Sequence, residues 1–251
     1  MEKMVEREIA REFYRYDGEP IDQASVRRLL AEFIVDSLGQ EIDRQKILNR
    51  LSEEHIAQRD WALDRNIQQL VSQRNNTYLK QVRDRLINRV AIPRREAIEA
   101  FRRITEGNDQ FGLFVGVAGL GKSCATAELL EKLIDAGIPC LALRMDIPTG
   151  EVTARGLGRK LNLPTSQIDV LNGMAGGRLS VLVIDQLDAL SLVSGRNQHI
   201  WQAFEDLLEE IRTCKNLKVW LACRDFDLEH DQRLRSLAEK AHQIHIAPRW
   251  I

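Results

Sequence analysis

The sequence has 251 residues, 44% of them hydrophobic, which is enough to build the core of one large domain or two small ones. Its 36 basic and 37 acidic residues leave a formal net charge of -1, which argues against a polycation that coats nucleic acid. The first residues lack the apolar segment of a secretory signal, and no apolar run reaches membrane-spanning length. The four cysteines show no paired spacing, so we expect a cytoplasmic globular protein without membrane contact, disulfide scaffold or zinc site.

The N-terminal part of the chain has a helical composition, rich in Arg, Glu, Leu and Gln. Apolar residues recur there at helical spacing in four stretches, namely Asp22–Gly39, Asp43–Leu51, Trp61–Val71 and Tyr78–Ile87. Pro93 suits the first position of a fifth helix. We therefore predict an all-helical region over residues 1–91.

From Phe111 onward, short apolar runs alternate with amphipathic stretches, which is typical of βα units around a parallel sheet. The predicted strands are Phe111–Val115, Cys140–Leu143, Val181–Ile184, Lys218–Ala222 and Gln243–Ile246. The predicted helices between and after them are Ser123–Ala136, Val152–Leu161, Ile200–Cys214 and Leu234–Ala241. The second half, residues 92–251, is therefore predicted to be a three-layer α/β domain.

Residues 116–123 match the phosphate-binding pattern G-x-x-x-x-G-K-[ST] between a predicted strand and a predicted helix. Glycines let successive backbone N–H groups face an anion, the helix start adds positive potential, and Lys122 reaches the β- and γ-phosphates. The Ser123 hydroxyl is a ligand for Mg²⁺. A glycine-rich turn with a solvated lysine is the alternative. The predicted nucleotide-binding residues are Gly116, Val117, Ala118, Gly119, Leu120, Gly121, Lys122, Ser123 and Cys124.

Asp185 follows the apolar run 181–184 and is predicted to be the metal-side carboxylate of a Walker B element, together with Ser123. Many related ATPases have Glu at the next position, where this chain has Gln186, which cannot take a proton. Asp188 is the candidate for orienting water or acting as general base. Its alternative role is the N-cap of a helix over 189–192, because Asp is a strong N-cap residue.

Arg224 follows the apolar strand that ends at Ala222 and Cys223, where related ATPases sense the γ-phosphate. Its guanidinium can bind phosphate oxygens through two parallel hydrogen bonds. The alternative is an arginine neutralised by Asp225 or Asp227. We expect Lys122, Asp188 and Arg224 to be the catalytic residues.

Residues 116–123, 183–190 and 221–224 together resemble the signal-transducing STAND ATPases, which include NACHT-type proteins and share a P-loop division with the AAA+ ATPases. The segments 223–229 and 194–196 look like bacterial members of this class, which are often associated with defence against phage. The resemblance implies a sheet of order 5-1-4-3-2, with the Arg224 strand between the phosphate-loop strand and the Asp185 strand. It also implies that a segment near 92–96 packs on adenine.

Proteins of the STAND class continue past the last strand into a winged-helix module and a repeat array. This sequence stops at Ile251. We therefore expect either a fragment of a longer chain or a partner that supplies the missing parts. Without a lid over the phosphates, ATP hydrolysis is expected to be slow.

One segment of the helical half is strongly basic. Residues 74–103 hold nine basic side chains (Arg74, Lys80, Arg83, Arg85, Arg89, Arg94, Arg95, Arg102 and Arg103) against three acidic ones. A basic helical face can lie on nucleic acid, but a charge run is more often a solvated face or an interface with an acidic neighbour.

We predict the first of three functions and keep the other two as alternatives. The first is an ATP- and Mg²⁺-dependent nucleotide switch that hydrolyses ATP and signals to protein partners or through self-association. The second is a nucleotide-binding assembly module without turnover. The third is an AAA+-like ATPase that works on nucleic acid. The pairing of Asp185 with Asp188 favours the first over the second, and the near-zero net charge disfavours the third.

Overall fold

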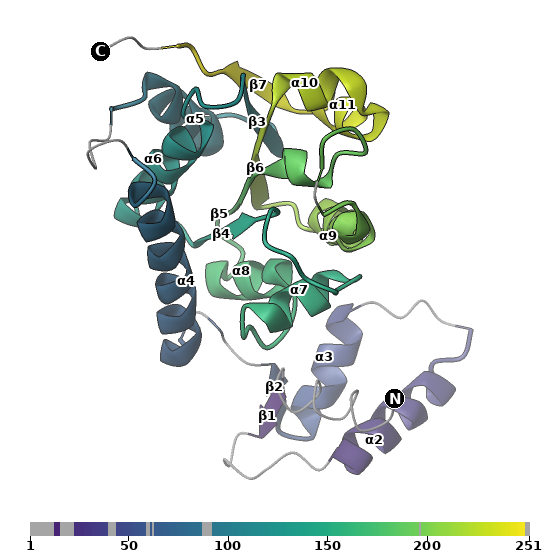
Figure 1. Ribbon diagram of the computed structural model, residues 1–251. Coiled ribbons are helices and arrows are strands. Elements are labelled where there is room, and N and C mark those ends of the chain that lie inside the picture. The colour runs from purple at the N-terminus through teal and green to yellow at the C-terminus, as the bar shows by residue number, and fades with distance from the viewer. Residues whose placement is uncertain are drawn as a thin grey trace. The chain divides into compact units, whose positions relative to one another are not determined.

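The computed structural model describes residues 13–15, 23–39, 44–58, 61, 63–86, 92–195 and 197–248 (Figure 1). The chain divides into two compact units, Met1–Asp64 and Arg65–Ile251. Some features named in the sequence lie outside the described residues, namely Asp22, Asp43, Ile87, Arg89, Arg196 and residues 249–251.

The first unit combines two helices with a short antiparallel strand pair. Its elements are β1 (Phe13–Arg15), α2 (Gln23–Asp36), α3 (Arg44–Glu53) and β2 (Ile56–Gln58). Leu29, Leu51 and Ile56 are buried against one another. The strand pair is an addition to the all-helical region predicted for residues 1–91, because three-residue strands are too short to show an alternating pattern.

The second unit is built on a five-stranded sheet. Its strands are β3 (Phe111–Val115), β4 (Cys140–Arg144), β5 (Ser180–Asp185), β6 (Leu217–Cys223) and β7 (His242–His245). All neighbouring strands are parallel, in the order β4-β5-β6-β3-β7. Numbered along the chain from β3, this order is 2-3-4-1-5, which read from the opposite edge is 5-1-4-3-2, so the predicted fold class and strand order are confirmed.

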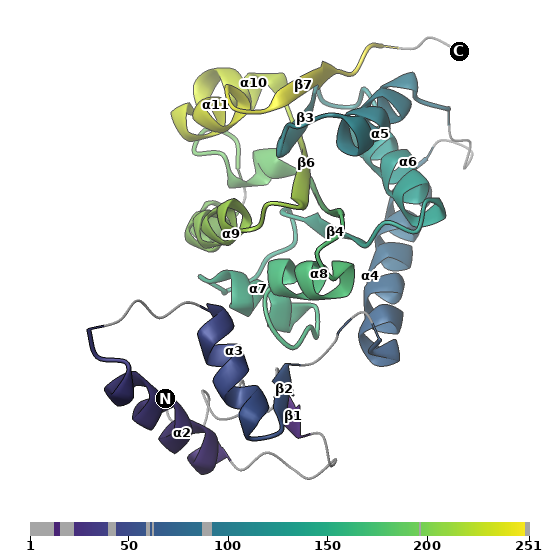
Figure 2. The ribbon, with the colours of Figure 1, turned by 180° about the vertical axis from the view of Figure 1, so that it is seen from behind.

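Helices cover both faces of this sheet. They are α4 (Arg65–Arg83), α5 (Arg95–Glu106), α6 (Lys122–Asp135), α7 (Ala154–Lys160), α8 (Gln167–Ala175), α9 (Trp201–Thr213), α10 (Asp225–His230) and α11 (Gln232–Ala238). Figures 1 and 2 show α4, α5 and α6 on one face and α7, α8 and α9 on the other. The result is the three-layer architecture that buried parallel strands require.

Trp220 is buried in the core between the sheet and α4, α5 and α6. Its ring packs on Phe114 of the neighbouring strand, with centroids 5.2 Å apart. A Cβ added to Gly112 would lie 2.1 Å from the Trp220 ring, so only glycine fits opposite it. This packing fixes the register of β3 against β6, and with it the level at which the loops after the two strands begin.

The third and fourth predicted helices form one continuous helix, α4, which belongs to the second compact unit. The sequence predicted two separate helices here, but Asn75, between them, is buried in α4 and binds the edge strand. Its Nδ2 donates to the carbonyl oxygen of Cys140 (2.8 Å), and its Oδ1 accepts from the N–H of Ala142 (3.0 Å). The compact units therefore divide at 64/65, whereas the sequence places the domain boundary at 91/92.

Within the part of the chain that the structure describes, no helix has both the length and the apolar character needed to cross a bilayer.

Candidate functional site

The phosphate loop connects β3 to α6. Gly119 and Gly121 have φ angles of 83° and 90°, in the left-handed region that favours glycine. Gly121 occupies the N-cap position of α6, so the helix begins at Lys122 with its backbone N–H groups at the mouth of the loop. The local geometry is therefore that of an anion-binding loop at a helix N-terminus.

Lys122 folds back onto this loop. Its Nζ donates hydrogen bonds to the carbonyl oxygens of Gly116 (2.7 Å) and Val117 (3.0 Å). Burial lowers the pKa of the Lys122 ammonium, and the nearby charge of Asp188 opposes that shift. In this structure the Lys122 ammonium is therefore held against the loop by these two carbonyl oxygens.

Arg94 also forms a hydrogen bond to the loop. Its Nη2 donates to the carbonyl oxygen of Leu120 (2.9 Å), and its Nη1 donates to that of Ala247 (3.2 Å). A Cβ at Gly121 would lie 2.6 Å from Nη2, so a larger residue there would have to displace the Arg94 guanidinium. The sequence assigned segment 92–96 to adenine contact, which stays a prediction. The bracing contact of Arg94 was missed, because nothing in the sequence pairs residues 26 positions apart.

Asp185 ends β5 and is almost fully buried, with 1% of its surface exposed. Its Oδ2 accepts a hydrogen bond from the Tyr78 hydroxyl (3.0 Å), and its Oδ1 accepts one from the Gln186 N–H (2.9 Å). Burial raises the pKa of the Asp185 carboxyl, while hydrogen bonds from Ser123, Tyr78 and the Gln186 backbone oppose the shift. Burial and the charge of Asp185 raise the pKa of Tyr78 as well.

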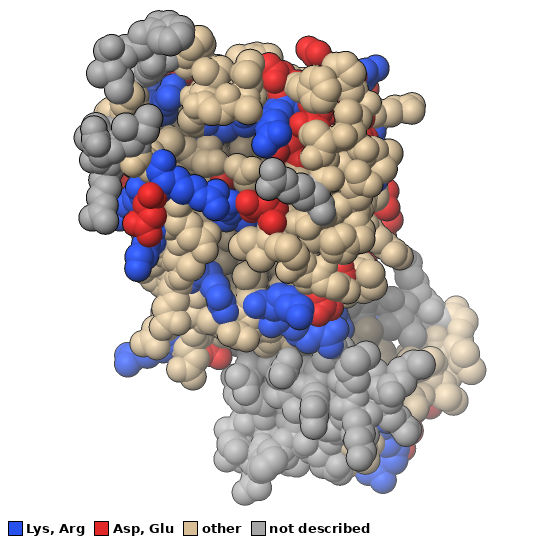
Figure 3. Space-filling view, in the orientation of Figure 1, with Lys and Arg blue, Asp and Glu red and all other residues tan. Residues whose placement is uncertain are grey.

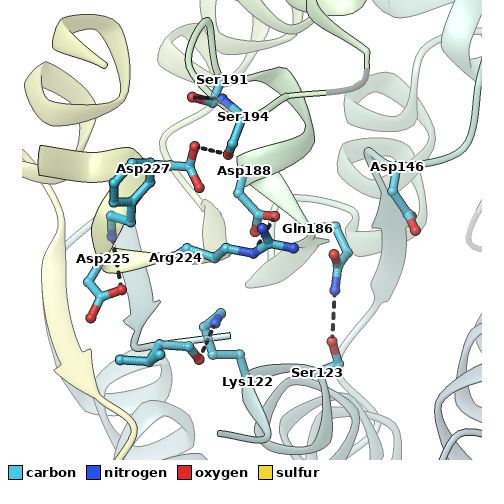
Figure 4. A network of polar contacts seen from close by, with 12 residues as sticks. Lys122, Ser123, Asp146, Gln186, Asp188, Ser191, Ser194, Arg224, Asp225 and Asp227 are labelled. Atoms are coloured by element: carbon cyan, nitrogen blue, oxygen red, sulfur yellow. Dashed lines mark hydrogen bonds and ion pairs between the residues drawn. The ribbon is translucent and has the colours of Figure 1, made fainter. Parts of the chain in front are cut away.

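Gln186 has a φ angle of 60°, which is uncommon for a residue other than glycine and often occurs at functional sites. Its Nε2 donates to the hydroxyl of Ser123 at 3.2 Å. Figure 4 shows its side chain directed at Ser123. Gln186 thus occupies one hydrogen-bonding position of the hydroxyl that is predicted to bind metal.

Asp188 lies inside a short 3-10 helix, Leu187–Leu190, whose N-cap position is Gln186. The alternative interpretation of Asp188 as a helix N-cap is therefore wrong. Burial raises the pKa of the Asp188 carboxyl, and the charges of Arg224 and Lys122 oppose that shift. Its carboxylate instead forms an ion pair with Arg224, in which Oδ2 and Nε are 3.0 Å apart.

Arg224 is thus paired with an acid, though not with either of the two that its sequence neighbourhood suggested. Asp225 accepts a hydrogen bond from the N–H of Phe226 (2.9 Å), and Asp227 accepts one from the Ser194 hydroxyl. Figure 4 shows Arg224 and Asp188 pointing toward each other, with Lys122 below them in this view. The structure therefore brings the three residues predicted to be catalytic to one place.

These residues surround a cavity of about 260 Å³. Its lining residues come from α4 and the turn after it, from the phosphate loop and the start of α6, and from the ends of β4, β5 and β6 or just after them: Val82, Arg85, Leu86, Ala118, Gly119, Gly121, Lys122, Ser123, Cys124, Arg144, Gln186, Asp188 and Arg224. The contributions of α4 and Arg144 were missed in the sequence, because α4 was assigned to a separate region. The sequence did identify most of the loop side of the cavity.

The oxygen donors at this site fit a hard divalent cation. Ser123 offers a hydroxyl and Asp185 a carboxylate, which match the oxygen preference of Mg²⁺. Among the described residues, no group of three or more His, Cys, Asp or Glu side chains is placed to hold a metal. One or two protein oxygens completed by phosphate and water are the usual arrangement for Mg²⁺ at nucleotide sites.

The phosphate-loop sequence and the strand order together give the second unit the fold of a P-loop NTPase. No family model and no curated protein matches the sequence.

Several solved structures are similar. AMPPCP-bound DnaA from Aquifex aeolicus is 15% identical with a TM-score of 0.40, over 60% of this chain and 44% of that one. The replication initiator DnaA bound to AMPPCP and single-stranded DNA is 14% identical with a TM-score of 0.42, over 64% and 49%. A Walker-type ATPase of Pyrococcus abyssi is 13% identical with a TM-score of 0.39, over 63% and 54%. The chain thus spans about half the length of these proteins.

Proposed function

We propose that this chain binds ATP with Mg²⁺ at the cavity beside the phosphate loop and hydrolyses it slowly, as a nucleotide switch. The observation that carries the proposal is the convergence of Lys122, Asp188 and Arg224, which follow three different strands, on one cavity that contains the phosphate loop. A cation, an acid and a second cation around an anion-binding loop are the groups that phosphoryl transfer needs.

Nucleotide binding is assigned to the loop residues 116–124. The backbone N–H groups at the start of α6 face the β-phosphate, and Lys122 leaves the carbonyl oxygens of Gly116 and Val117 to contact the β- and γ-phosphates. The hydrogen bond from Arg94 to the carbonyl oxygen of Leu120 stabilises the conformation of the loop. The site is therefore shaped before the ligand arrives, which lowers the cost of ordering the loop.

Ser123 and Asp185 are proposed to hold Mg²⁺, which when bound neutralises charge on the β- and γ-phosphates. Asp188 is proposed to orient the attacking water, and Arg224 to bind the γ-phosphate oxygens. In the structure these two residues bind each other, so neither is free for its role. Before hydrolysis, this ion pair has to open and Gln186 has to release the Ser123 hydroxyl. We propose that these two steps make turnover slow.

The switch function rests on the resemblance of residues 183–190 and 221–224 to STAND ATPases, in which the nucleotide state controls contacts with protein partners or self-association. A role in bacterial defence is the finer part of this proposal. The sequence divides the chain into a helical region over 1–91 and an ATPase domain over 92–251. We propose to keep these two parts but to assign α4 to the ATPase domain, because α4 lines the cavity.

A nucleotide-binding module without turnover is the second candidate. It is favoured by Gln186, which lacks the proton-accepting carboxylate of many related ATPases and binds Ser123 at 3.2 Å. A nucleic-acid function has less support. Basic and acidic side chains are interspersed on the face in Figure 3, and Arg83 of the basic segment is paired with Glu131.

Calorimetric titration and phosphate release with the parent chain, Lys122→Ala and Lys132→Ala test the proposal. We expect Lys122→Ala to weaken ATP binding at least tenfold, or about 1.4 kcal/mol. Lys132 lies on the same helix outside the cavity and pairs with Glu128, so its variant should bind ATP normally. Equal affinity of all three proteins would overturn the nucleotide site, and tight binding without phosphate release would select the second candidate.

A further inference from the structure

The Tyr78 hydroxyl reaches the carboxylate that is proposed to hold metal. It donates to Oδ2 of Asp185 at 3.0 Å, and the two residues are 3% and 1% exposed. Tyr78 belongs to α4, which precedes the phosphate loop in the sequence and lies outside every motif used to assign the site. A buried hydrogen bond to a carboxylate is among the stronger polar contacts in proteins.

Packing fixes Tyr78 independently of this bond. One turn earlier on α4, Asn75 binds Cys140 and Ala142 of β4 with both atoms of its amide. One turn later, Val82 is buried in the same apolar cluster as Tyr78. The phenol is therefore held at the end of β5 by the docking of a whole helix, and it approaches Asp185 from a fixed direction.

The carboxylate of Asp185 is held at both oxygens. Oδ1 receives the N–H of Gln186 and Oδ2 receives the Tyr78 hydroxyl. The neighbouring cation Arg144 is engaged by both oxygens of Asp146, at 2.9 and 2.5 Å. Tyr78 is thus a side chain from outside the nucleotide-binding motifs that is placed to set the orientation of this carboxylate.

We propose that Tyr78 is a positioning residue that orients Asp185 toward Mg²⁺, so that α4 is a structural part of the metal site. This inference rests on the proposed metal role of Asp185. Groups that hydrogen-bond to a metal ligand fix its direction, and their loss typically weakens metal binding by about 10- to 100-fold.

The test measures Mn²⁺ binding to the complex with ADP by electron paramagnetic resonance, and ADP binding in EDTA by titration. Tyr78→Phe removes one oxygen and keeps the ring. We expect it to weaken Mn²⁺ binding about tenfold or more while leaving ADP binding in EDTA unchanged. If the variant does not fold, it is replaced by Tyr78→Met, which also lacks the donor and whose flexible side chain adapts to an apolar site.

Asn75→Ala is the matched control, because it loosens the docking of α4 without removing the bond to Asp185. It should lower the melting temperature and keep Mn²⁺ affinity within about twofold of the parent, well short of the loss typical of a metal-ligand partner. If it weakens Mn²⁺ binding as much as Tyr78→Phe, helix docking alone explains the effect and the inference is wrong.

Asp185→Asn separates this inference from the proposed function. If it weakens Mn²⁺ binding and Tyr78→Phe does not, only the role of Tyr78 is overturned. If it leaves Mn²⁺ binding unchanged, the metal role of Asp185 falls, and the positioning role of Tyr78 falls with it.

Discussion

Arg224 and Asp188 neutralise each other in the structure, with Nε of one and Oδ2 of the other 3.0 Å apart. The arginine comes from the end of β6 and the acid from the 3-10 helix after β5, so the pair bridges two neighbouring strands. Both residues line the cavity of the phosphate loop. On the proposed function, the phosphate groups of ATP compete with Asp188 for the Arg224 guanidinium. This competition sets the fraction of molecules in which Asp188 can contact water and Arg224 can contact phosphate.

The first prediction follows from that competition. Asp188→Asn should keep Mg·ATP binding and lose phosphate release by at least about 10²-fold, because an amide orients water poorly and cannot accept its proton. Asp225→Asn is the control, since Asp225 bonds to the backbone of Phe226 and makes no ion pair with Arg224. Phosphate release at the parental rate in Asp188→Asn would show that Asp188 serves only to hold Arg224.

The second prediction concerns Gln186. Gln186→Glu should raise turnover about tenfold or more at saturating ATP, because a carboxylate at this position can take the proton of the attacking water. Gln198→Glu adds the same charge at an exposed position and should leave turnover unchanged. Phosphate release under Mg²⁺ excess is the measurement. A decrease in Gln186→Glu would mean that the hydrogen bond from Gln186 to Ser123 supports catalysis.

The third prediction tests the support of the phosphate loop. Arg94→Ala removes the hydrogen bonds to Leu120 and Ala247. Each such bond from a charged group contributes about 1.5–3 kcal/mol, so the melting temperature should fall, and ATP affinity should fall about tenfold as the loop loosens. Arg95→Ala, at the exposed neighbouring position, should change neither. Unchanged ATP affinity in Arg94→Ala would limit its role to stability.

The fourth prediction is a pH dependence of stability. Burial alone would raise the pKa of the Asp231 carboxyl, but hydrogen bonds from Arg233 and from the N–H of Leu192, with the charge of Arg233, lower it from 3.8 to about 2. A lowered pKa in the folded state stabilises the protein above pH 4, and that stabilisation is lost as the pH falls from 4 toward 2.

Urea unfolding measures this effect. Asp231→Asn should lower the free energy of unfolding by about 2 kcal/mol at pH 7, and the difference from the parent should shrink between pH 4 and pH 2. Glu229→Gln, at an exposed position, should leave the curve unchanged. A difference that stays constant over this range would mean that Asp231 contributes through neutral hydrogen bonds rather than through its charge.

The sequence predicts the second unit well because its signals are local. Buried strands such as Val181–Ile184 are apolar on both faces, and the phosphate-loop glycines occupy fixed positions between a strand and a helix. The whole of α8 was missed, although Ser166 caps it and accepts from the N–H of Asp169 at 3.2 Å. A helix of nine residues gives a much shorter apolar period than α6 or α9.

The contacts that complete the site could not be predicted, because they join residues far apart in the sequence. The bond from Tyr78 to Asp185 spans 107 positions, and Asn75 meets β4 65 positions away. Asn75 lies between two stretches that the sequence predicted as separate helices, and its amide binds backbone groups of the edge strand β4. Tertiary contact overrode local propensity there.

The insertion of β6 between β3 and β5 sets the width of the site. At about 4.7–4.9 Å per strand, the loops after β3 and β5 begin roughly 10 Å apart. A sheet with β3 and β5 as neighbours would halve that span and leave no strand end between the two loops. The strand order itself therefore places Arg224, at the end of β6, between the phosphate loop and the segment that carries Asp188.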